Sequence, residues 1–195
     1  MLGFIRKYIG DLFVGRKWYL LAGCCVILLF LSFFVHFLFQ PAVAFASAFL
    51  ALTLLDYVLL FFVKGGITAQ RLVTAQFSIA DENPVACVVS NSFPFKAKVR
   101  LIDELPVQFQ ERDFERHLII PYKSDCTLDY TLRPLARGEF GFGYMICFAA
   151  SPIGLLNRRF RAAEPVTVRV YPSYLQLKKY QLLATTGSAM PGVKK

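Results

Sequence analysis

Two long apolar segments, joined by a short polar link, constrain this chain more than any other feature of its sequence. They cover residues 18–39 and 42–63, and among Asp, Glu, Lys, Arg and His each contains a single residue, His36 in the first and Asp56 in the second. A helix of about 20 residues is ~30 Å long and matches the hydrocarbon core of a bilayer. We therefore expect two transmembrane helices, and the link at Gln40-Pro41 forces them into an antiparallel hairpin.

Cationic residues flank the hairpin on both sides, whereas its turn carries no charge. Under the positive-inside rule, this pattern places both ends of the hairpin in the cytoplasm. Residues 1–17 are then a basic cytoplasmic N-terminus. The chain is expected in the inner (cytoplasmic) membrane, in contact with the lipid bilayer, with its soluble domain also cytoplasmic. The flanking cations are Arg6, Lys7, Arg16, Lys17, Lys64 and Arg71.

A cleavable signal peptide is the rival interpretation of the first apolar segment. Small-residue triplets at 42–44 and 46–48 resemble cleavage sites. The first apolar segment is longer than the core of a signal peptide, which has about 7–15 residues. Because a second spanning segment follows at once, the chain remains a membrane protein under either interpretation.

Asp56 is a carboxyl group inside an apolar segment, and such groups often mark a proton or ion pathway. It lies about 12 Å from Lys64 along a helix. It could there be neutral, bond to Tyr19 or face another subunit, whereas His36 lies near the opposite end of the hairpin. Because two helices do not make a transporter, a role in helix packing is favoured.

Short strand-like runs follow the hairpin. In residues 96–102, Ala97, Val99 and Leu101 alternate with cationic side chains, as in a strand with one buried face. The regular spacing of about seven such runs predicts an immunoglobulin-like antiparallel β-sandwich over residues 67–172. Residues 173–195 are expected to be a tail or a linker to a further domain. The expected strands are 71–79, 85–90, 96–102, 117–121, 126–133, 139–148 and 166–170.

The run 139–148 has the strongest alternation, with Phe140, Phe142, Tyr144, Ile146 and Phe148 expected on one face. Such a stripe could stack on a ligand or a nucleic-acid base, but alternating aromatic residues more often fill a sandwich core.

Other candidate catalytic groups lack an arrangement that suggests chemistry. His117 is a lone histidine, expected to be structural or solvent-facing, and the carboxylates at 103–104 and at 111, 113 and 115 are expected to be solvated. None of the phosphate-binding, nucleophile-elbow or zinc-protease motifs occurs. We therefore predict a non-enzyme with no catalytic, cofactor-binding or metal-binding residues.

Cysteine and charge content limit the remaining functional classes, metal-binding and nucleic-acid-binding proteins. The five cysteines are Cys24, Cys25, Cys87, Cys126 and Cys147, and they form no C-x-x-C pair, so no zinc pattern can be assembled. The last three are expected to be buried thiols, although a disulfide is open if the domain faces an oxidising compartment. The net charge of +9 is compatible with nucleic acid, but no nucleic-acid-binding motif accompanies it.

Several runs together resemble a bacterial family of uncharacterised membrane proteins that occur beside MoxR-type AAA+ ATPases. Residues 133–143, RPLARGEFGFG, resemble its "P-x-x-R-G-x-[YF]-x-[FL]-G" segment, and residues 151–156, SPIGLL, resemble its "D-P-[FL]-G-L-F". Residues 168–172, VRVYP, are similar to its "V-x-V-Y-P". Asn91 and the run Asp103-Glu104-Leu105-Pro106 fit two further positions.

The resemblance implies an N-terminal pair of membrane helices and, after the part matched here, a von Willebrand factor A-like domain. Ser151 departs from the family pattern, which has aspartate at this position. The implied function is that of a non-catalytic membrane-anchored scaffold or adaptor. It would work with a MoxR-type ATPase in the assembly or activation of an envelope-associated complex. The alternative is an extracytoplasmic, membrane-tethered binding module with reversed topology and a Cys87–Cys147 or Cys87–Cys126 disulfide.

Overall fold

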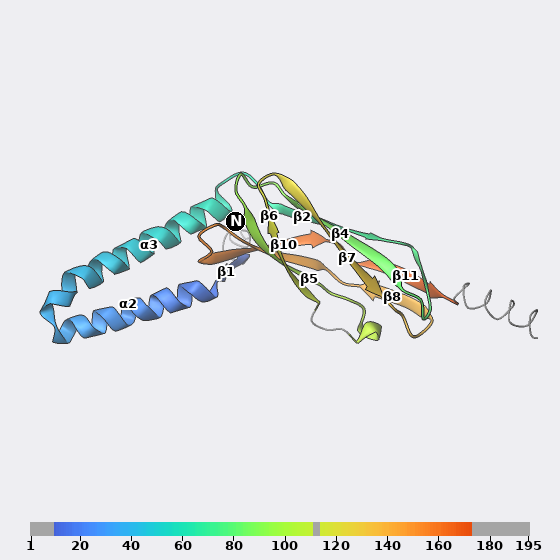
Figure 1. Ribbon diagram of the computed structural model, residues 1–195, viewed down its shortest axis with the longest axis horizontal. Coiled ribbons are helices and arrows are strands. Elements are labelled where there is room, and N and C mark those ends of the chain that lie inside the picture. The colour runs from blue at the N-terminus through green and yellow to red at the C-terminus, as the bar shows by residue number, and fades with distance from the viewer. Residues whose placement is uncertain (1–9, 111–113, 173–195) are drawn as a thin grey trace, which may run out of the picture.

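The computed structural model describes residues 10–110 and 114–172 of the chain. An arm of two antiparallel helices extends from one end of an elongated β-sandwich (Figure 1). This confirms the coarse architecture expected from the sequence, two long apolar helices followed by an all-β sandwich-like domain. The predicted tail at 173–195, the cations Arg6 and Lys7, and the carboxylates at 111 and 113 lie outside the described residues.

The two helices are α2 (Arg16–Phe34) and α3 (Phe39–Phe61), and a short 3₁₀ turn, η1 (His36–Leu38), connects them. Both helices are long and apolar enough to cross a membrane. The turn therefore comes several residues before the expected link, and Pro41 lies in the first turn of α3. A proline fits there because the backbone N–H groups of the first helical turn have no partner within the helix.

The larger sheet has five antiparallel strands in the order β1-β10-β9-β5-β6. Its outermost strand β1 precedes the first helix, so the segment expected as a separate N-terminus contributes to the sandwich. Neither β1 nor β10 is expected from the sequence. The strands are β1 (Leu12–Val14), β10 (Leu156–Ala163), β9 (Met145–Ala150), β5 (Ala97–Asp103) and β6 (Glu115–Ile120).

The layer facing the five-stranded sheet is the three-stranded sheet β2-β4-β7. The other three-stranded sheet, β3-β11-β8, packs against β4 and β7, where Phe77 and Phe140 share a cluster with Val85 and Leu132. All pairings in these two sheets are antiparallel except β3 with β11, which is parallel. The strands are β2 (Ile67–Val73), β4 (Asn83–Asn91), β7 (Ser124–Leu132), β3 (Gln76–Ser78), β11 (Val166–Tyr171) and β8 (Gly138–Phe142).

Two buried clusters fill the sandwich. One joins the five-stranded sheet to β2 and β4 through residues such as Val89, Val99 and Cys147. The other lies at the end away from the helices, around Phe77, Phe140 and Phe142. The predicted inward positions Ala97, Val99 and Leu101 are all buried, as the alternation in that run indicated.

The aromatic run 139–148 is two strands, not one. β8 and β9 belong to different sheets. The strand is interrupted at Gly143-Tyr144, where the Glu104 carboxylate accepts the N–H of Tyr144 at 3.0 Å. The break shifts the alternation by one residue, because a strand has a period of two. The prediction of a single aromatic face was therefore wrong. Phe140 and Phe142 are buried, whereas Tyr144 and Phe148 lie on the outside.

The run 71–79 also divides, into β2 and β3 in different sheets. Arg71, expected beside the lipid headgroups, lies inside the sandwich with a side chain only 2% exposed. Asp103, expected to be solvated, is its buried partner. These two corrections share one cause, since both charges satisfy each other in the core.

Candidate functional site

The carboxylate of Asp56 joins helix α3 to the sandwich. It is fully buried, and one oxygen accepts the backbone N–H groups of Leu155 and Leu156 at 2.8 and 2.7 Å. The other oxygen accepts the hydroxyl of Ser151. Ser151 and Leu155 belong to the connection between β9 and β10, and Leu156 is the first residue of β10. The carboxylate therefore satisfies backbone groups that would otherwise be buried without partners.

The β9–β10 connection has a shape that suits this contact. The Ser151 hydroxyl also accepts the N–H groups of Ile153 at 3.1 Å and Gly154 at 3.4 Å, which closes a serine turn. Gly154 has a φ of +72°, where a residue without Cβ is favoured. The turn directs the next two N–H groups at Asp56.

The chain before α2 makes a second attachment to the same connection. The N–H of Gly15 donates to the carbonyl of Leu155 at 2.8 Å, and a Cβ on Gly15 would lie 2.8 Å from that oxygen. Earlier in the chain, at the residue before β1, Asp11 forms an ion pair with Arg159 of β10 at 3.0 Å. Both ends of the helical hairpin are thus fastened to the same corner of the sandwich.

Apolar and cationic contacts complete this helix–sandwich joint, defined here by Gly15, Asp56, Ser151, Leu155 and Leu156. Leu60 and Phe61 pack on Leu155 and Leu156, with Trp18 beside them. The Arg158 guanidinium donates to the carbonyl of Leu60 at 2.7 Å, near the end of α3, where backbone carbonyls lack helical partners.

The prediction that Asp56 packs the two helices together was wrong. Its partners come from the sandwich and not from Tyr19, which is 62% exposed, or from helix α2. A serine at position 151 suits this contact. A hydroxyl can donate to Asp56, whereas an aspartate would bring a second carboxyl group into contact with it.

We predict that Ser151→Asp weakens the joint more than Ser151→Ala. Alanine removes the hydrogen bond to Asp56 and the side-chain acceptor of the Ile153 and Gly154 N–H groups, but it adds no acidic group, and we expect a loss of about 1 kcal/mol. Aspartate adds a buried acidic group against another, and we expect a loss of at least ~2 kcal/mol. Thermal unfolding of the detergent-solubilised chain, followed by tryptophan fluorescence of Trp18, compares the two. Equal stability of both variants would contradict the geometry described for Ser151.

A second polar site lies inside the sandwich. The Arg71 guanidinium binds the Asp103 carboxylate through two nitrogens and also donates to the carbonyl of Gly143 at 3.2 Å. The Tyr130 hydroxyl donates to Asp103 at 2.7 Å. This network links both layers at the point where β8 gives way to β9. Burial, with the Asp103 charge next, raises the pKa of Tyr130 well above its ordinary value, so its proton stays on the phenol.

Two buried thiols adjoin this network. Burial raises the pKa of Cys87 to about 11 and that of Cys147 to about 12. Thiols of this kind are poor nucleophiles, because the thiolate is the reactive form. All five cysteines are free thiols in the structure.

We expect the two buried thiols to lower stability at alkaline pH. Their pKa values are raised in the folded state, so the folded chain holds protons that the unfolded chain loses above pH ~9. Their stabilising effect is present below pH 9 and is lost as pH rises through about 11 to 12. Denaturant midpoints measured between pH 8 and 11 should fall less steeply for Cys87→Ala/Cys147→Ala than for the unsubstituted chain. Parallel curves would contradict the prediction.

The remaining candidates from the sequence do not assemble into one site. His117 is exposed, as expected, and lies 3.0 Å from Glu115. Tyr144 and Phe148 are covered by the guanidinium groups of Arg161 and Arg100. Within residues 10–110 and 114–172, no group of three or more His, Cys, Asp and Glu side chains is placed to hold a metal ion.

Comparisons with known proteins identify no family. No protein-family model matches the chain, and no curated protein matches it. Solved structures with a similar arrangement include a CARDB domain from Pyrococcus furiosus, with 10% identity and a TM-score of 0.38, covering 56% of this chain and 96% of that one. A PapD-like domain of human CEP192 has 8% identity and a TM-score of 0.36, with 54% and 87% coverage.

A PKD domain of an M14-like peptidase from a Thermoplasmatales archaeon is similarly distant, with 11% identity and a TM-score of 0.33, covering 54% of this chain and 94% of that one. These neighbours are immunoglobulin-like domains. Similarity of this degree carries no inference about ligand, partner or activity.

Proposed function

We propose that this chain is a non-catalytic, membrane-anchored scaffold that holds its β-sandwich in a fixed position at the membrane surface. The observation that carries the proposal is the helix–sandwich joint centred on Asp56. A flexible tether would need only a linker between helix and domain. This chain instead uses buried hydrogen bonds to bind both ends of the hairpin to one corner of the sandwich.

Insertion of the hairpin is supported by the exposure of its apolar side chains. In the most apolar 18-residue stretch of α2, only 6% of the residues are buried within the described chain. In that of the second candidate span, His36–Phe61, 11% are buried. Leu20, Phe33 and Phe37 are 63%, 85% and 88% exposed. Apolar surface of this extent is unfavourable in water, and a bilayer covers it. The helices are therefore unlike core helices of a soluble domain, which would be mostly buried.

The cations support an orientation with both hairpin ends in the cytoplasm. Arg16, Lys17 and Lys64 are exposed at the sandwich end of the arm, whereas the turn at 35–41 carries no Lys or Arg. The sandwich would then face the cytoplasm at the inner membrane. This is the compartment in which a MoxR-type AAA+ ATPase, the partner implied by the family resemblance, would be available.

Topology and partner binding can be tested with the full chain. A fluorescent reporter that folds only in the cytoplasm, fused after Lys195, should be active, and a phosphatase reporter at the same position should not. The chain in nanodiscs should bind a MoxR-type ATPase from the same genome and change its ATP turnover. An active phosphatase fusion together with a Cys87–Cys147 or Cys87–Cys126 disulfide on non-reducing gels would instead favour the extracytoplasmic binding module. Cytoplasmic topology without ATPase binding would leave the anchor and remove the proposed partner.

A further inference from the structure

The outer face of the five-stranded sheet is rich in cations near the helices. Alternation along each strand sets apart the side chains that point away from the core, and the strand register aligns them in rows. Asn157, Ala150 and Lys98 form the row nearest the joint. Arg159, Phe148, Arg100 and His117 form the next row.

The rows can be placed relative to the arm from contacts in the joint. Leu155 is bound to Gly15, the residue before the exposed cations Arg16 and Lys17 at the start of α2. Asn157 follows Leu155 by two residues, about 7 Å along a strand. The headgroup layer on each side of a bilayer is about 5–7 Å thick. The first row therefore lies at the depth of the headgroups when the arm is inserted, and the second row lies just outside.

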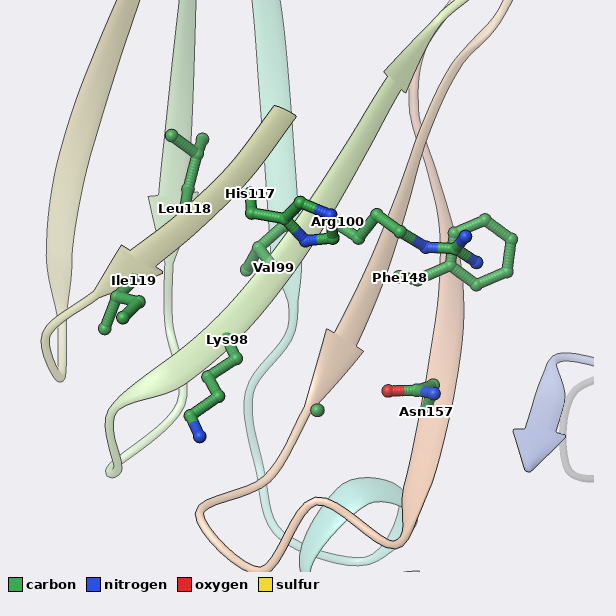
Figure 2. A pocket seen from close by; sticks show the side chains of 9 residues that line it. Lys98, Val99, Arg100, His117, Leu118, Ile119, Phe148 and Asn157 are labelled. Carbon is green, nitrogen blue, oxygen red and sulfur yellow. The ribbon is translucent and has the colours of Figure 1, made fainter. Parts of the chain in front are cut away.

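A hollow of about 410 Å³ lies over these rows. Lys98, Arg100, His117 and Asn157 are among the residues that line it (Figure 2). The Arg100 guanidinium lies over the Phe148 ring, 4.5 Å from its centroid, with His117 beside it. Lys98 makes no ion pair among the residues that the structure describes. The neighbouring carboxylate, Glu115, is 3.7 Å from Arg100.

Neighbouring loops add cations at the same end of the sandwich. The N–H of Ser92 donates to the carbonyl of Gly66 at 3.0 Å, so the loop that carries Lys96 lies beside the end of α3. The Asn91 side chain donates to the carbonyls of Phe95 and Pro121, at 3.0 and 2.7 Å, which brings the loop with Lys123 alongside. Lys64, Lys96 and Lys123 are all exposed. The surface facing the headgroups is therefore positively charged.

We infer that this hollow binds the phosphate of an anionic glycerophospholipid headgroup in the leaflet next to the sandwich. Lys98 and Arg100 supply the charge, and the amide of Asn157 and the ring of His117 supply further hydrogen-bond donors. The inference rests on the proposed insertion of the hairpin, which sets the depth of the hollow. A bound headgroup would fix how the sandwich leans on the membrane and would make its position depend on lipid composition.

The test uses the full chain in detergent with an equimolar mixture of phosphatidylglycerol and phosphatidylcholine, and counts retained lipids by native mass spectrometry. The variant Lys98→Gln/Arg100→Gln should lower the retained ratio of phosphatidylglycerol to phosphatidylcholine about threefold to tenfold, since each cation at an anionic surface contributes measurably. The control Arg137→Gln/Arg169→Gln removes two exposed cations from the far end of the sandwich and should leave the ratio unchanged.

Competitors distinguish the lipid from other anions. Neither inorganic phosphate nor a hexaglutamate peptide at the same concentration should displace phosphatidylglycerol from the unsubstituted chain. An unchanged ratio in the Lys98/Arg100 variant, or displacement by either competitor, would overturn the inference while leaving the anchor intact. A chain that stays soluble and monomeric without detergent or lipid would overturn both the inference and the proposed function.

Discussion

Replacing Asp56 with alanine is expected to detach the β9–β10 connection from helix α3. Alanine leaves the N–H groups of Leu155 and Leu156 and the hydroxyl of Ser151 without their acceptor in a buried place. Each unsatisfied buried donor costs about 1–3 kcal/mol, so a total on the order of 4 kcal/mol is expected. Hydrogen exchange at the amides of Leu155 and Leu156 should speed up by at least two orders of magnitude, while amides within β4 and β7 keep their protection.

The variant Asp56→Asn separates hydrogen bonding from charge. Its amide oxygen can still accept the two backbone N–H groups, so most of the protection at Leu155 and Leu156 should remain. A matched control is Thr53→Ala, one helical turn earlier, which removes only a hydroxyl bonded to the carbonyl of Phe49 within the helix. Unchanged exchange in Asp56→Ala would show that the joint is held by apolar packing alone.

The second large effect is expected from the buried ion pair of the sandwich. Asp103→Ala leaves the Arg71 guanidinium buried without a counter-charge and removes the acceptor of Tyr130. Breaking a buried pair by removing one partner costs about 3–5 kcal/mol. We expect this loss in the free energy of unfolding. It can be measured by denaturant titration of the full chain, followed by far-ultraviolet circular dichroism at a wavelength where the β-sheet signal is strong.

An exposed pair provides the comparison. Arg169 and Glu139 lie 3.1 Å apart with side chains 66% and 65% exposed, so Glu139→Ala should change stability little. The double variant Arg71→Met/Asp103→Leu should recover much of the loss of Asp103→Ala, since apolar replacements of a buried pair are often tolerated. A double variant as unstable as Asp103→Ala would contradict the attribution to an unpaired charge.

The sequence predicts the parts of this fold that rest on periodicity and length. The apolar runs predict both helices, and the alternation at Ala97, Val99 and Leu101 predicts the buried face of β5. Periodicity cannot show where a strand changes sheet. The run through Gly143 reads as one strand, and only the contact of Tyr144 with Glu104 reveals the break that turns Phe148 outward.

The candidate site was less accessible to sequence reasoning, because it joins residues about 100 positions apart. The sequence shows Asp56 as a carboxyl group in an apolar segment and residues 151–156 as a run rich in turn residues. Nothing in the sequence indicates that the two are in contact. A possible signal was their complementarity. A carboxylate in an apolar helix needs donors, and a tight turn with serine and glycine presents backbone N–H groups. The same reasoning applies to Arg71 and Asp103, whose burial appears only once the sheets pack.

The distance between the tip of the helical arm and the far end of the sandwich tests the central claim most directly. Spin labels at Gln40 and Arg137, both exposed, can be introduced after replacing Cys24, Cys25 and Cys126, while the buried Cys87 and Cys147 remain in place. In lipid nanodiscs, pulsed electron paramagnetic resonance should give one narrow distance distribution, which broadens in Asp56→Ala. A broad distribution in the chain that retains Asp56 would show a flexible tether and would contradict a sandwich held rigidly at the membrane.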